Sequence, residues 1–344
     1  MKLLLLAGEE SGCIYAERIA DAVRASRSDV EIRGYADYGF QIGDLAVIGF
    51  WAVLRRIGFF LKVKRTMERA IDEWRPDVVC TVDYPGMNLK LAAYAKRRGI
   101  RAVHVVCPQV WAWHAGRIPK IEAALDKLCC FFPFEPKLFK PGFAEFVGHP
   151  LVEDFGEKGA RERGLVAILP GSRIGEIEHH LPTMIEACAG MNWRIPAANE
   201  RAYAKIVAIA GKERTQLGGA RELLKRADCA VVASGTATLE AALAGCPTAL
   251  VYRVGPVLAF VVRHLIRGIG HLGLANIVAE KAGKDCPMPE FLQEDFTAKN
   301  VRAQLEKWLS DELSRAQAVE ALAETMKLIV SNGDSMTKIA RFLI

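Results

Sequence analysis

Residues 165–173, Leu-Val-Ala-Ile-Leu-Pro-Gly-Ser-Arg, join a short apolar run to a turn that contains glycine. Residues 230–236, Ala-Val-Val-Ala-Ser-Gly-Thr, repeat this arrangement, and each turn runs into a segment with a helical pattern. A fully apolar run that precedes an amphipathic helix is typical of a parallel strand buried on both faces. These stretches therefore predict an α/β domain whose parallel sheet is covered by helices.

The first half of the chain has the same organisation. An apolar run at residues 3–7 leads into a turn and a helical pattern, and further apolar runs lie at 78–82, 102–106 and 128–132. We therefore expect two Rossmann-like domains with parallel sheets that face a cleft. The expected domains span residues 1–150 and 151–325, and a C-terminal helix follows at 326–344.

The composition narrows the functional classes. Of the 344 residues, 51% are hydrophobic and 25% are charged, which excludes a chain that is mainly disordered. The net charge of +6 is too small and too scattered to indicate nucleic-acid binding, but it suits an anionic substrate or an acidic membrane surface. The nine cysteines lie among apolar residues without the spacing of metal ligands. They predict reduced, buried thiols of a cytoplasmic protein rather than a disulfide framework or a zinc site.

Residues 45–65 combine apolar and basic residues at helical spacing. One stripe holds Phe50, Trp51, Leu54, Ile57, Phe60 and Leu61, and beside it lie Arg55, Arg56, Lys62, Lys64 and Arg65. An amphipathic helix of this kind favours contact with a bilayer surface, although a buried helix of an α/β domain is the alternative. The charges within the segment exclude a spanning helix, and no run reaches the ~20 apolar residues that spanning needs. The apolar start of the chain is too short for an export signal, so we expect an intracellular protein.

The turn at residues 170–173 suits a phosphate group. A turn between a strand and a helix exposes free backbone N–H groups at the positive end of the helix dipole. Gly171, Ser172 and Arg173 combine such a turn with a hydroxyl donor and a fixed cation. An ordinary turn in which Ser172 caps the helix explains the same residues equally well.

The second turn has the same character. Ser234, Gly235 and Thr236 bring small groups and N–H donors toward an anion, with Ser234 or Thr236 as the helix cap. Glu240 lies one helical turn further on, where a carboxylate suits the vicinal hydroxyls of a ribose or is simply a solvated helix residue. Two such turns in one domain indicate a nucleotide diphosphate at the carboxyl edge of the sheet.

Asp83 follows the apolar run at 78–82 and is therefore expected at the carboxyl end of a strand. Open α/β sheets place their ligands at that edge. Asp83 can act there as a general base on an acceptor hydroxyl, or it can begin a turn before Pro85.

Glu9 and Glu10 lie in the first strand-to-helix turn. They either stabilise the N-terminus of the following helix or bind sugar hydroxyls.

An aromatic cluster follows one of the apolar runs of the first half. Trp111 and Trp113 lie on the same side of an extended segment, as a platform for a sugar or acyl chain or as core aromatics. Arg117 and Lys120 come next and can balance the charge of a phosphate. His149 either contacts a ligand or is a hydrogen-bonded hinge histidine.

These motifs, in this order, resemble the lipid-A-disaccharide synthases, which are inverting glycosyltransferases of lipopolysaccharide assembly. The resemblance rests on stretches at 7–12, 44–49, 83–88, 108–113, 134–135, 148–150, 169–173 and 233–240, and so covers most of the chain. The combination of Gln-Val-Trp-Ala-Trp, Leu-Pro-Gly-Ser-Arg and Ala-Ser-Gly-Thr-Ala-Thr-Leu-Glu is highly specific. It implies a GT-B fold, with the acceptor domain first and the nucleotide-sugar domain second.

The resemblance also implies a reaction and a location. UDP-2,3-diacylglucosamine is joined to 2,3-diacylglucosamine 1-phosphate (lipid X), which forms a β(1→6) tetraacyl disaccharide 1-phosphate and releases UDP. The reaction needs no metal or other cofactor, and the enzyme is peripheral on the cytoplasmic face of the inner membrane. Members of the family can exchange C-terminal segments between subunits. The C-terminal helix is therefore expected to pack back on the first domain or to belong to the partner in a homodimer.

The implied site residues fall into three groups. Asp83 takes the proton from the acceptor 6-hydroxyl, while Arg173 and the two turns stabilise the charge that grows on the departing UDP. Glu240 holds the ribose. Contacts to the acceptor or the sugar are expected from Glu9, Ser11, Asn88, Gln109, Trp111, Arg117, Lys120, His149 and Asn276.

The sequence departs from the family pattern in the first domain and near residue 275. Cys13 stands where the family has an aspartate, Gly86 stands at a second acidic position, and Ala275 replaces the proline of a Leu-Pro-Asn element. The regions after Gly34 and at 190–225 look shortened.

Two alternatives remain at this point. One is another GT-B enzyme that uses UDP-N-acetylglucosamine, either a transferase or a 2-epimerase with a soluble substrate. It predicts that Phe50, Trp51 and Phe60 are buried. The other is a non-catalytic module that binds a nucleotide or a lipid.

Overall fold

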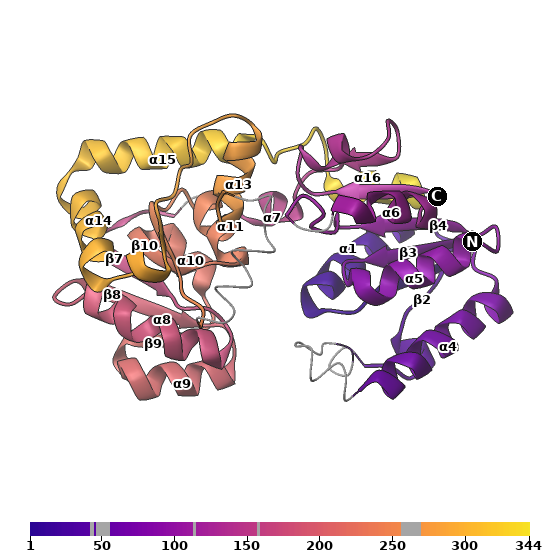
Figure 1. Ribbon diagram of the computed structural model, residues 1–344, viewed down its shortest axis with the longest axis horizontal. Helices are drawn as coiled ribbons and strands as arrows, with labels where there is room; N and C mark the ends of the chain where they lie inside the picture. The colour runs from indigo at the N-terminus through magenta and orange to yellow at the C-terminus, as the bar shows by residue number, and fades with distance from the viewer. Residues whose placement is uncertain (42–44, 46–55, 113–114, 157–158, 256–269) are drawn as a thin grey trace. The chain divides into compact units, whose positions relative to one another are not determined.

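The computed structural model describes residues 1–41, 45, 56–112, 115–156, 159–255 and 270–344. The chain divides into two compact units (Figure 1). Unit 1 comprises Met1–Pro150 and Ser331–Ile344, and unit 2 comprises Leu151–Val330. In the parts of the chain described above, every helix falls short of the length or the hydropathy that crossing a membrane requires.

Unit 1 contains a six-stranded parallel sheet with the strand order β2-β1-β3-β4-β5-β6. Its strands are β1 (Lys2–Ala7), β2 (Glu31–Arg33), β3 (Val78–Val82), β4 (Arg101–Val105), β5 (Lys127–Cys130) and β6 (Ala144–Phe146). Its helices are α1 (Glu10–Ser26), α4 (Ile57–Trp74), α5 (Pro85–Lys96), α6 (Ile118–Ala124) and α16 (Ser335–Leu343), with short 3-10 helices η1 (Ala36–Tyr38), η2 (Ala115–Arg117) and η3 (Glu135–Leu138).

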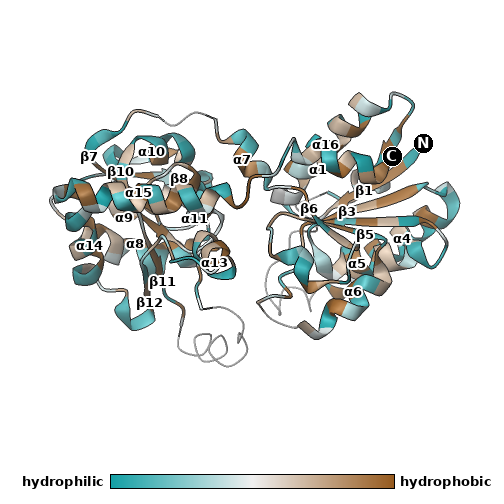
Figure 2. Ribbon diagram, turned by 90° about the horizontal axis from the view of Figure 1, so that it is seen from above, coloured by the Kyte–Doolittle hydropathy of each residue, from teal (hydrophilic) through white to brown (hydrophobic). Residues whose placement is uncertain are grey.

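Strand β1 shows why its sequence is apolar throughout. Successive residues of a strand point to opposite faces of the sheet. Leu3 and Leu5 therefore pack with α1 and α16, while Leu4 and Leu6 pack with α4 and α5. Each fully buried leucine contributes about 1.5–3 kcal/mol, so both helical layers are held by this one strand. The apolar strands between partly polar helices are visible in Figure 2.

Unit 2 repeats this architecture with the strand order β12-β11-β10-β7-β8-β9. Its strands are β7 (Glu162–Leu169), β8 (Asn192–Ala197), β9 (Thr215–Leu217), β10 (Ala227–Ala233), β11 (Thr248–Tyr252) and β12 (Glu290–Leu292). Its helices are α7 (Pro150–Asp154, which spans the unit boundary), α8 (Ile174–Ala187), α9 (Glu200–Ala210), α10 (Ala220–Arg226), α11 (Thr236–Leu243), α13 (Leu274–Lys281), α14 (Ala298–Ser310) and α15 (Glu312–Lys327), with 3-10 helices η4 (Lys212–Arg214) and η5 (Gln293–Asp295).

The predicted α/β class and the parallel sheets are confirmed. The predicted apolar runs correspond to β1, β3, β4, β5, β7 and β10. The interior strand β8 and the short edge strands β2, β6, β9 and β12 were not among the predicted elements. Exposed or half-buried residues interrupt each of them, so they lack the continuous apolar run that marks a fully buried strand.

The C-terminal segment returns to unit 1 at Ser331 rather than at residue 326, because α15 continues to Lys327 within unit 2. The Ser331 hydroxyl donates to the carbonyl oxygen of Val147 at 2.7 Å. Beyond it, α16 buries Ile339 and Leu343 against α1 of the same chain.

Candidate functional site

The first predicted turn joins β7 to α8 in unit 2. Gly171 has a φ of +103°, and a Cβ at this position would lie 2.6 Å from Oε2 of Glu176. Only glycine fits both conditions. Arg173 is the N-cap of α8, and its guanidinium lies 3.0 Å from Oε1 of Glu176 while the side chain remains 62% exposed. The alternative in which Ser172 caps the helix is contradicted, because Arg173 is the N-cap and α8 begins at Ile174.

The second turn joins β10 to α11. Gly235 is the N-cap, with φ +155° and ψ −166°, a conformation that essentially only glycine adopts. The expected cap by Ser234 or Thr236 is also wrong, because α11 begins at Thr236 itself and the Ser234 hydroxyl donates to the carbonyl of Leu272 at 3.2 Å. The hydroxyl of Thr238 donates to the Gly235 carbonyl at 2.7 Å and fixes the turn from inside the helix.

Both turns line one cavity of about 380 Å³. Strands β7 and β10 are parallel neighbours, so their carboxyl ends meet at the same edge of the sheet. The cavity is lined by residues 169–173, by 233–237 and by Glu240 of α11. The carboxylate of Glu240 accepts a hydrogen bond from Nε of Arg221 at 2.9 Å, which orients it at the wall. Two helix N-termini, the cation Arg173 and the carboxylates of Glu176 and Glu240 thus surround a space suited to an anionic ligand that also carries hydroxyls.

Asn276 was expected to contact the sugar, but its side chain is buried within unit 2. It is fully buried, and its amide donates to the Met288 carbonyl at 2.7 Å and to Glu290 at 2.8 Å. Glu290 also accepts from the backbone N–H groups of Leu272 and Gly273. The expected sugar contact of Asn276 is therefore corrected to a positioning role for the turn before α13. Glu290 was missed because it lies on the short strand β12.

In unit 1, Asp83 follows β3 as predicted, in an unusual backbone conformation. Asp83 and Tyr84 have φ values of +49° and +51°, and two consecutive non-glycine residues in this region store strain of about 1–3 kcal/mol each. The Tyr84 N–H donates to Oδ1 of Asp83 at 2.8 Å. Burial raises the pKa of the Asp83 carboxyl, and this hydrogen bond partly opposes the rise. A carboxylate that takes up protons more readily is suited to general-base catalysis.

Asn88 holds this strained turn. Its amide nitrogen contacts the carbonyl oxygens of Leu6, Val82 and Asp83 at 3.2, 3.1 and 2.8 Å. Its amide oxygen accepts from the Tyr35 hydroxyl at 2.8 Å, and the residue is fully buried. The expected acceptor contact of Asn88 is therefore corrected to a positioning role: the amide fixes the backbone on which Asp83 is presented.

Gly8 and Glu9 lie beside the same turn. A Cβ on Gly8 would lie 2.4 Å from the Tyr84 ring, so glycine is required there. Glu9 is exposed at the N-cap of α1, without a side-chain cap for that helix. Burial, and to a lesser extent the charge of Glu9, raises the pKa of the Tyr84 phenol. Ser11 is in the first turn of α1, and its side chain lies outside the described residues.

The aromatic motif is anchored by a residue that the sequence analysis left without a role. Nε1 of Trp111 donates to Oε1 of the buried Glu135 at 3.2 Å, and the indole meets the Phe134 ring edge to face. Burial raises the pKa of Glu135 to about 8. Gln109 and Lys120 are exposed and Arg117 is half-buried, whereas Trp113 lies outside the described residues.

His149 belongs to the core of unit 1. It is 6% exposed, and its ring lies 5.3 and 5.4 Å from the rings of Phe131 and Phe132. Burial lowers the pKa of the imidazole to about 4, so the ring is neutral at physiological pH. The structure places this ring among the core aromatics of unit 1, and both interpretations of its role stay predictions.

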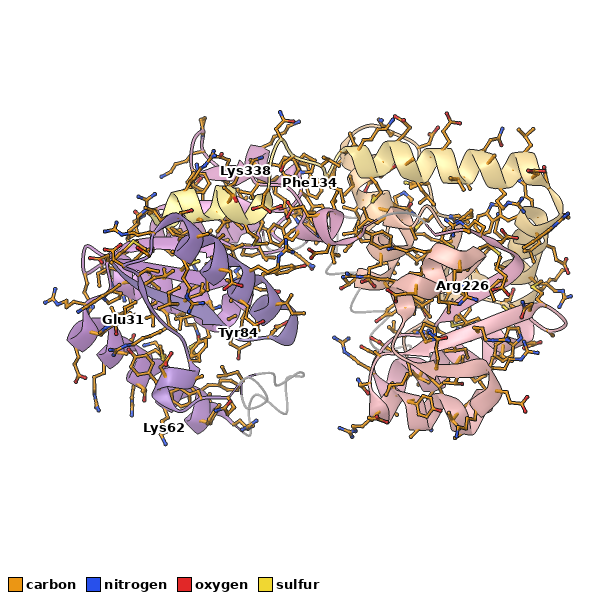
Figure 3. All side chains as sticks on the ribbon, turned by 180° about the vertical axis from the view of Figure 1, so that it is seen from behind. Glu31, Lys62, Tyr84, Phe134, Arg226 and Lys338 are labelled. Atoms are coloured by element: carbon orange, nitrogen blue, oxygen red, sulfur yellow. The ribbon has the colours of Figure 1, made fainter. Side chains whose placement is uncertain are left out.

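A second cavity, of about 450 Å³, is lined in part by Tyr84. Tyr84 is labelled in Figure 3. Its walls are mainly apolar, with Lys64 and Lys90 among them; the other lining residues are Ile57, Phe60, Leu61, Tyr84, Gly86 and Met87. Ile57 and Leu61 are 55% and 48% exposed, and Phe60 is half-buried. Arg56 places its guanidinium over the Phe59 ring. The predicted contacts Phe50, Trp51, Leu54 and Arg55 lie outside the described residues.

Comparison with known proteins identifies the family. The family described as lipid-A-disaccharide synthetase matches residues 3–341. Proteins named lipid-A-disaccharide synthase from Geobacter metallireducens and Koribacter versatilis are 30% and 34% identical to this chain. These alignments cover 97% and 96% of the chain and 94% of each relative.

Solved structures show the fold. Acinetobacter baumannii MurG has a TM-score of 0.58 at 12% identity, over 99% of this chain and 98% of its own. The UDP-GlcNAc 2-epimerase of Methanocaldococcus jannaschii, solved with UDP-GlcNAc and UDP, has a TM-score of 0.57 at 14% identity, over 100% and 99%. Both likenesses support the GT-B architecture, and the family match favours the synthase over the epimerase and the non-catalytic alternatives. With a match over nearly its whole length and relatives at 30% identity or more, the chain belongs to the lipid-A-disaccharide synthase family of glycosyltransferases.

Proposed function

We propose that this protein transfers 2,3-diacylglucosamine from UDP to the 6-hydroxyl of 2,3-diacylglucosamine 1-phosphate. The products are the β(1→6) tetraacyl disaccharide 1-phosphate and UDP. Family membership supports the reaction and the use of a UDP-sugar. The observation that carries the proposal is the cavity of unit 2, where both glycine turns and Glu240 converge.

In this proposal the cavity binds the UDP moiety. The N-termini of α8 and α11 direct backbone N–H groups and partial positive charge toward the pyrophosphate. Arg173 leaves Glu176 to grip a phosphate oxygen, which its exposure permits. Ser172 and the Ser234–Thr236 turn donate further hydrogen bonds, and Glu240 accepts from the ribose hydroxyls. These groups stabilise the charge on the leaving UDP, so the reaction proceeds without a metal.

Asp83 is the proposed general base. It takes the proton of the acceptor 6-hydroxyl as the hydroxyl oxygen attacks the anomeric carbon, which carries oxocarbenium character in the transition state. Inversion follows because the oxygen attacks from the face opposite the UDP. Strain at Asp83 and Tyr84, held by Asn88, presents the carboxylate in one fixed orientation.

The apolar cavity beside Tyr84 is proposed to receive an acyl chain of the lipid substrate. An acyl chain contributes about 0.8 kcal/mol for each buried CH₂ group, so it leaves a bilayer only for a comparably apolar site. Exposed Ile57 and Leu61, with Lys64 at the same cavity, suit a peripheral contact with the acidic cytoplasmic face of the inner membrane.

The direct test is incubation with both acylated glucosamine substrates, with and without a chelator, while UDP release and disaccharide formation are measured. We expect both products in equal amounts and equal rates in the two conditions. UDP release without disaccharide would contradict the transfer reaction, and loss of activity in chelator would contradict metal independence.

A further inference from the structure

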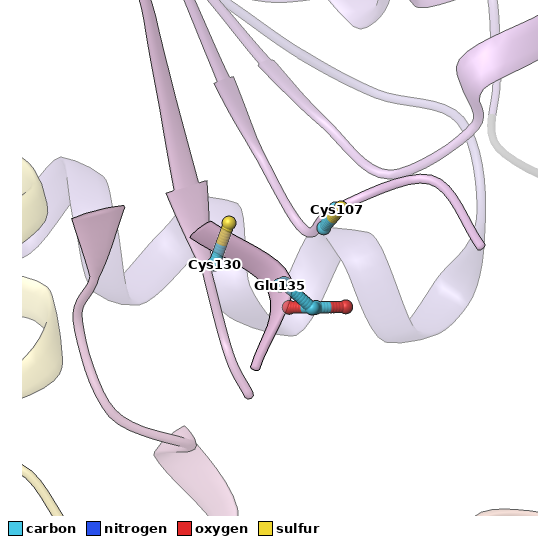
Figure 4. A group of neighbouring side chains, drawn as sticks. All are labelled: Cys107, Cys130 and Glu135. Carbon is cyan, nitrogen blue, oxygen red and sulfur yellow. The ribbon is translucent and has the colours of Figure 1, made fainter. Parts of the chain in front are cut away.

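A buried cluster of two thiols and a carboxylate lies at the carboxyl edge of the unit 1 sheet (Figure 4). Cys107 follows β4, Cys130 ends β5, and Glu135 begins η3. One sulfur from each cysteine and one carboxylate oxygen lie within 4.8 Å of one another. The three residues are 4%, 0% and 2% exposed. None of them lines either of the cavities to which the transfer reaction has been assigned.

A strained turn after β4 brings Cys107 close to Cys130 and Glu135. Strands β4 and β5 are parallel neighbours, with Val105 paired to Cys129. The next residue, Val106, has a φ of +76°, which is a genuine outlier for a β-branched side chain. Its N–H still donates to the carbonyl of Cys129 at 3.1 Å. The chain therefore turns sharply at Val106, and Cys107 is held over the end of β5.

Glu135 is buried in this cluster without a positive partner among the described residues. A buried glutamate is almost always paired with a positive group. In the described part of the chain, Glu135 accepts hydrogen bonds from Trp111 and from the Phe132 N–H at 3.2 and 3.1 Å, and no Lys, Arg or His forms an ion pair with it. Each carboxylate oxygen has more than one lone pair, so either can still bind a cation.

We propose that Cys107, Cys130 and Glu135 form a binding site for a thiophilic divalent cation of the Zn²⁺ class. In a tetrahedral zinc site the ion lies ~2.3 Å from sulfur and ~2.0–2.2 Å from a carboxylate oxygen, so two ligand atoms are roughly 3.6–3.8 Å apart. Side-chain rotations that shorten the observed spread of 4.8 Å by about 1 Å would close the three groups on one ion. Three protein ligands leave one coordination position open, as in zinc sites that exchange a bound molecule.

The chemistry of the ligands supports a soft cation over Mg²⁺ or Ca²⁺. Magnesium and calcium take oxygen ligands, whereas thiolates select zinc and its softer neighbours. Binding forms two metal–sulfur bonds and one metal–oxygen bond, and the two thiols and the Glu135 carboxyl release their protons to solvent without any change of oxidation state. The site is separate from the transfer reaction, which remains metal-free in our proposal.

The test uses the reduced full-length protein and the metal alone. Cd²⁺ reports thiolate ligation through a sulfur-to-metal charge-transfer absorption, and Zn²⁺ competition gives the affinity. We expect one equivalent of Cd²⁺ to bind with this absorption. Cys107→Ala and Cys130→Ala should each weaken binding by at least about tenfold, the loss that even outer-shell changes can cause. Glu135→Gln should weaken binding while it retains the absorption.

Cys129→Ala is the matched control. Cys129 precedes Cys130 on β5 but packs on the opposite face of the sheet, with α1 and α16. It should bind Cd²⁺ like the wild type. Absence of the absorption in the wild type, or its survival in both Cys107→Ala and Cys130→Ala, would overturn the proposal.

Thermal unfolding without metal establishes that each variant is folded, and Cys107→Ser and Cys130→Ser serve as replacements if an alanine variant is not. UDP release is measured in a separate assay. A protein that binds no metal but makes disaccharide therefore refutes the metal site alone, and the reverse result refutes the proposed transfer reaction alone.

Discussion

The two units present their candidate sites by different means. In unit 2, two stretches of consecutive residues, 169–173 and 233–237, supply most of the cavity wall, and Gly171 and Gly235 set its backbone locally. In unit 1, the conformation at Asp83 depends on Asn88 of the next helix, and Asn88 is held in turn by Leu6 and Tyr35 from distant parts of the chain. A locally encoded site tolerates changes elsewhere in its unit. A site held by distant contacts depends on the packing of the whole unit.

The largest expected effect follows from removing the base in unit 1. Asp83→Ala should lower kcat by about 10²–10⁴-fold, the usual contribution of general acid–base catalysis. UDP affinity, measured by calorimetry, should not change, because the described residues that line the cavity for UDP belong to unit 2. Asp72→Ala, which removes an exposed carboxylate of α4, is the control. Unchanged turnover in Asp83→Ala would eliminate this residue as the base.

A smaller effect is expected from altering the local geometry of unit 2. Gly171→Ala forces a Cβ to within 2.6 Å of Glu176 at a φ of +103°. Strain of this kind costs about 1–3 kcal/mol, so the turn should shift and UDP affinity should fall about tenfold or more.

Gly175→Ala provides the comparison for that variant. Gly175 lies in α8, four residues on, and a Cβ there meets open space. UDP affinity should be unchanged and the helix should gain roughly 0.5–1 kcal/mol of stability. Equal UDP affinity in Gly171→Ala and Gly175→Ala would show that the first turn does not bind the pyrophosphate.

The same contrast explains what the sequence can predict. The central strands are continuous apolar runs, so both sheets and the two turns of unit 2 follow from sequence order alone. Asn88 and Asn276 were expected to contact sugars, because an isolated asparagine beside a motif does not reveal its partners. Only the folded chain brings Asn88 to three carbonyl oxygens and Asn276 to Glu290.

The sequence likewise does not reveal that Glu135 and two cysteines are neighbours. Cys107, Cys130 and Glu135 follow no metal-ligand spacing, and they meet because β4 and β5 end at one edge of the sheet. Helix caps failed for a different reason. The sequence predicts that a cap is near, but in each turn the residue that caps the helix lies one position away from the expected one.

The next largest effect is expected on binding of the protein to membranes. The double variant Ile57→Ser, Leu61→Ser removes two exposed apolar side chains of α4 and should lower binding to vesicles of acidic phospholipid by about tenfold. Leu313→Ser on α15 of unit 2 is the matched control, since Leu313 is 68% exposed. Cosedimentation measures both. Equal loss in the two variants, or no loss in either, would argue against a membrane surface at α4.

The smallest expected effect concerns the pH dependence of stability in unit 1. Burial raises the pKa of Asp83 above its ordinary value of 3.8 in the folded protein. Between the unfolded and the folded pKa, the folded state binds more protons, so the free energy of unfolding falls as the pH rises through this interval. Above the folded pKa the loss is complete, because the desolvated carboxylate is then charged.

Asp83→Asn removes this titration while it keeps the size of the side chain, and asparagine tolerates the φ of +49° better than most residues. Urea denaturation should therefore show a variant that is more stable than the wild type at neutral pH, with an advantage that shrinks as the pH falls from the folded pKa of Asp83 to 3.8 and is lost below 3.8. A constant difference across this range would mean that the carboxylate is as well solvated in the folded protein as in the unfolded chain. Asp83 would then lack the raised proton affinity that suits it to accept the proton of the acceptor hydroxyl, even though its place at the end of β3 is unchanged.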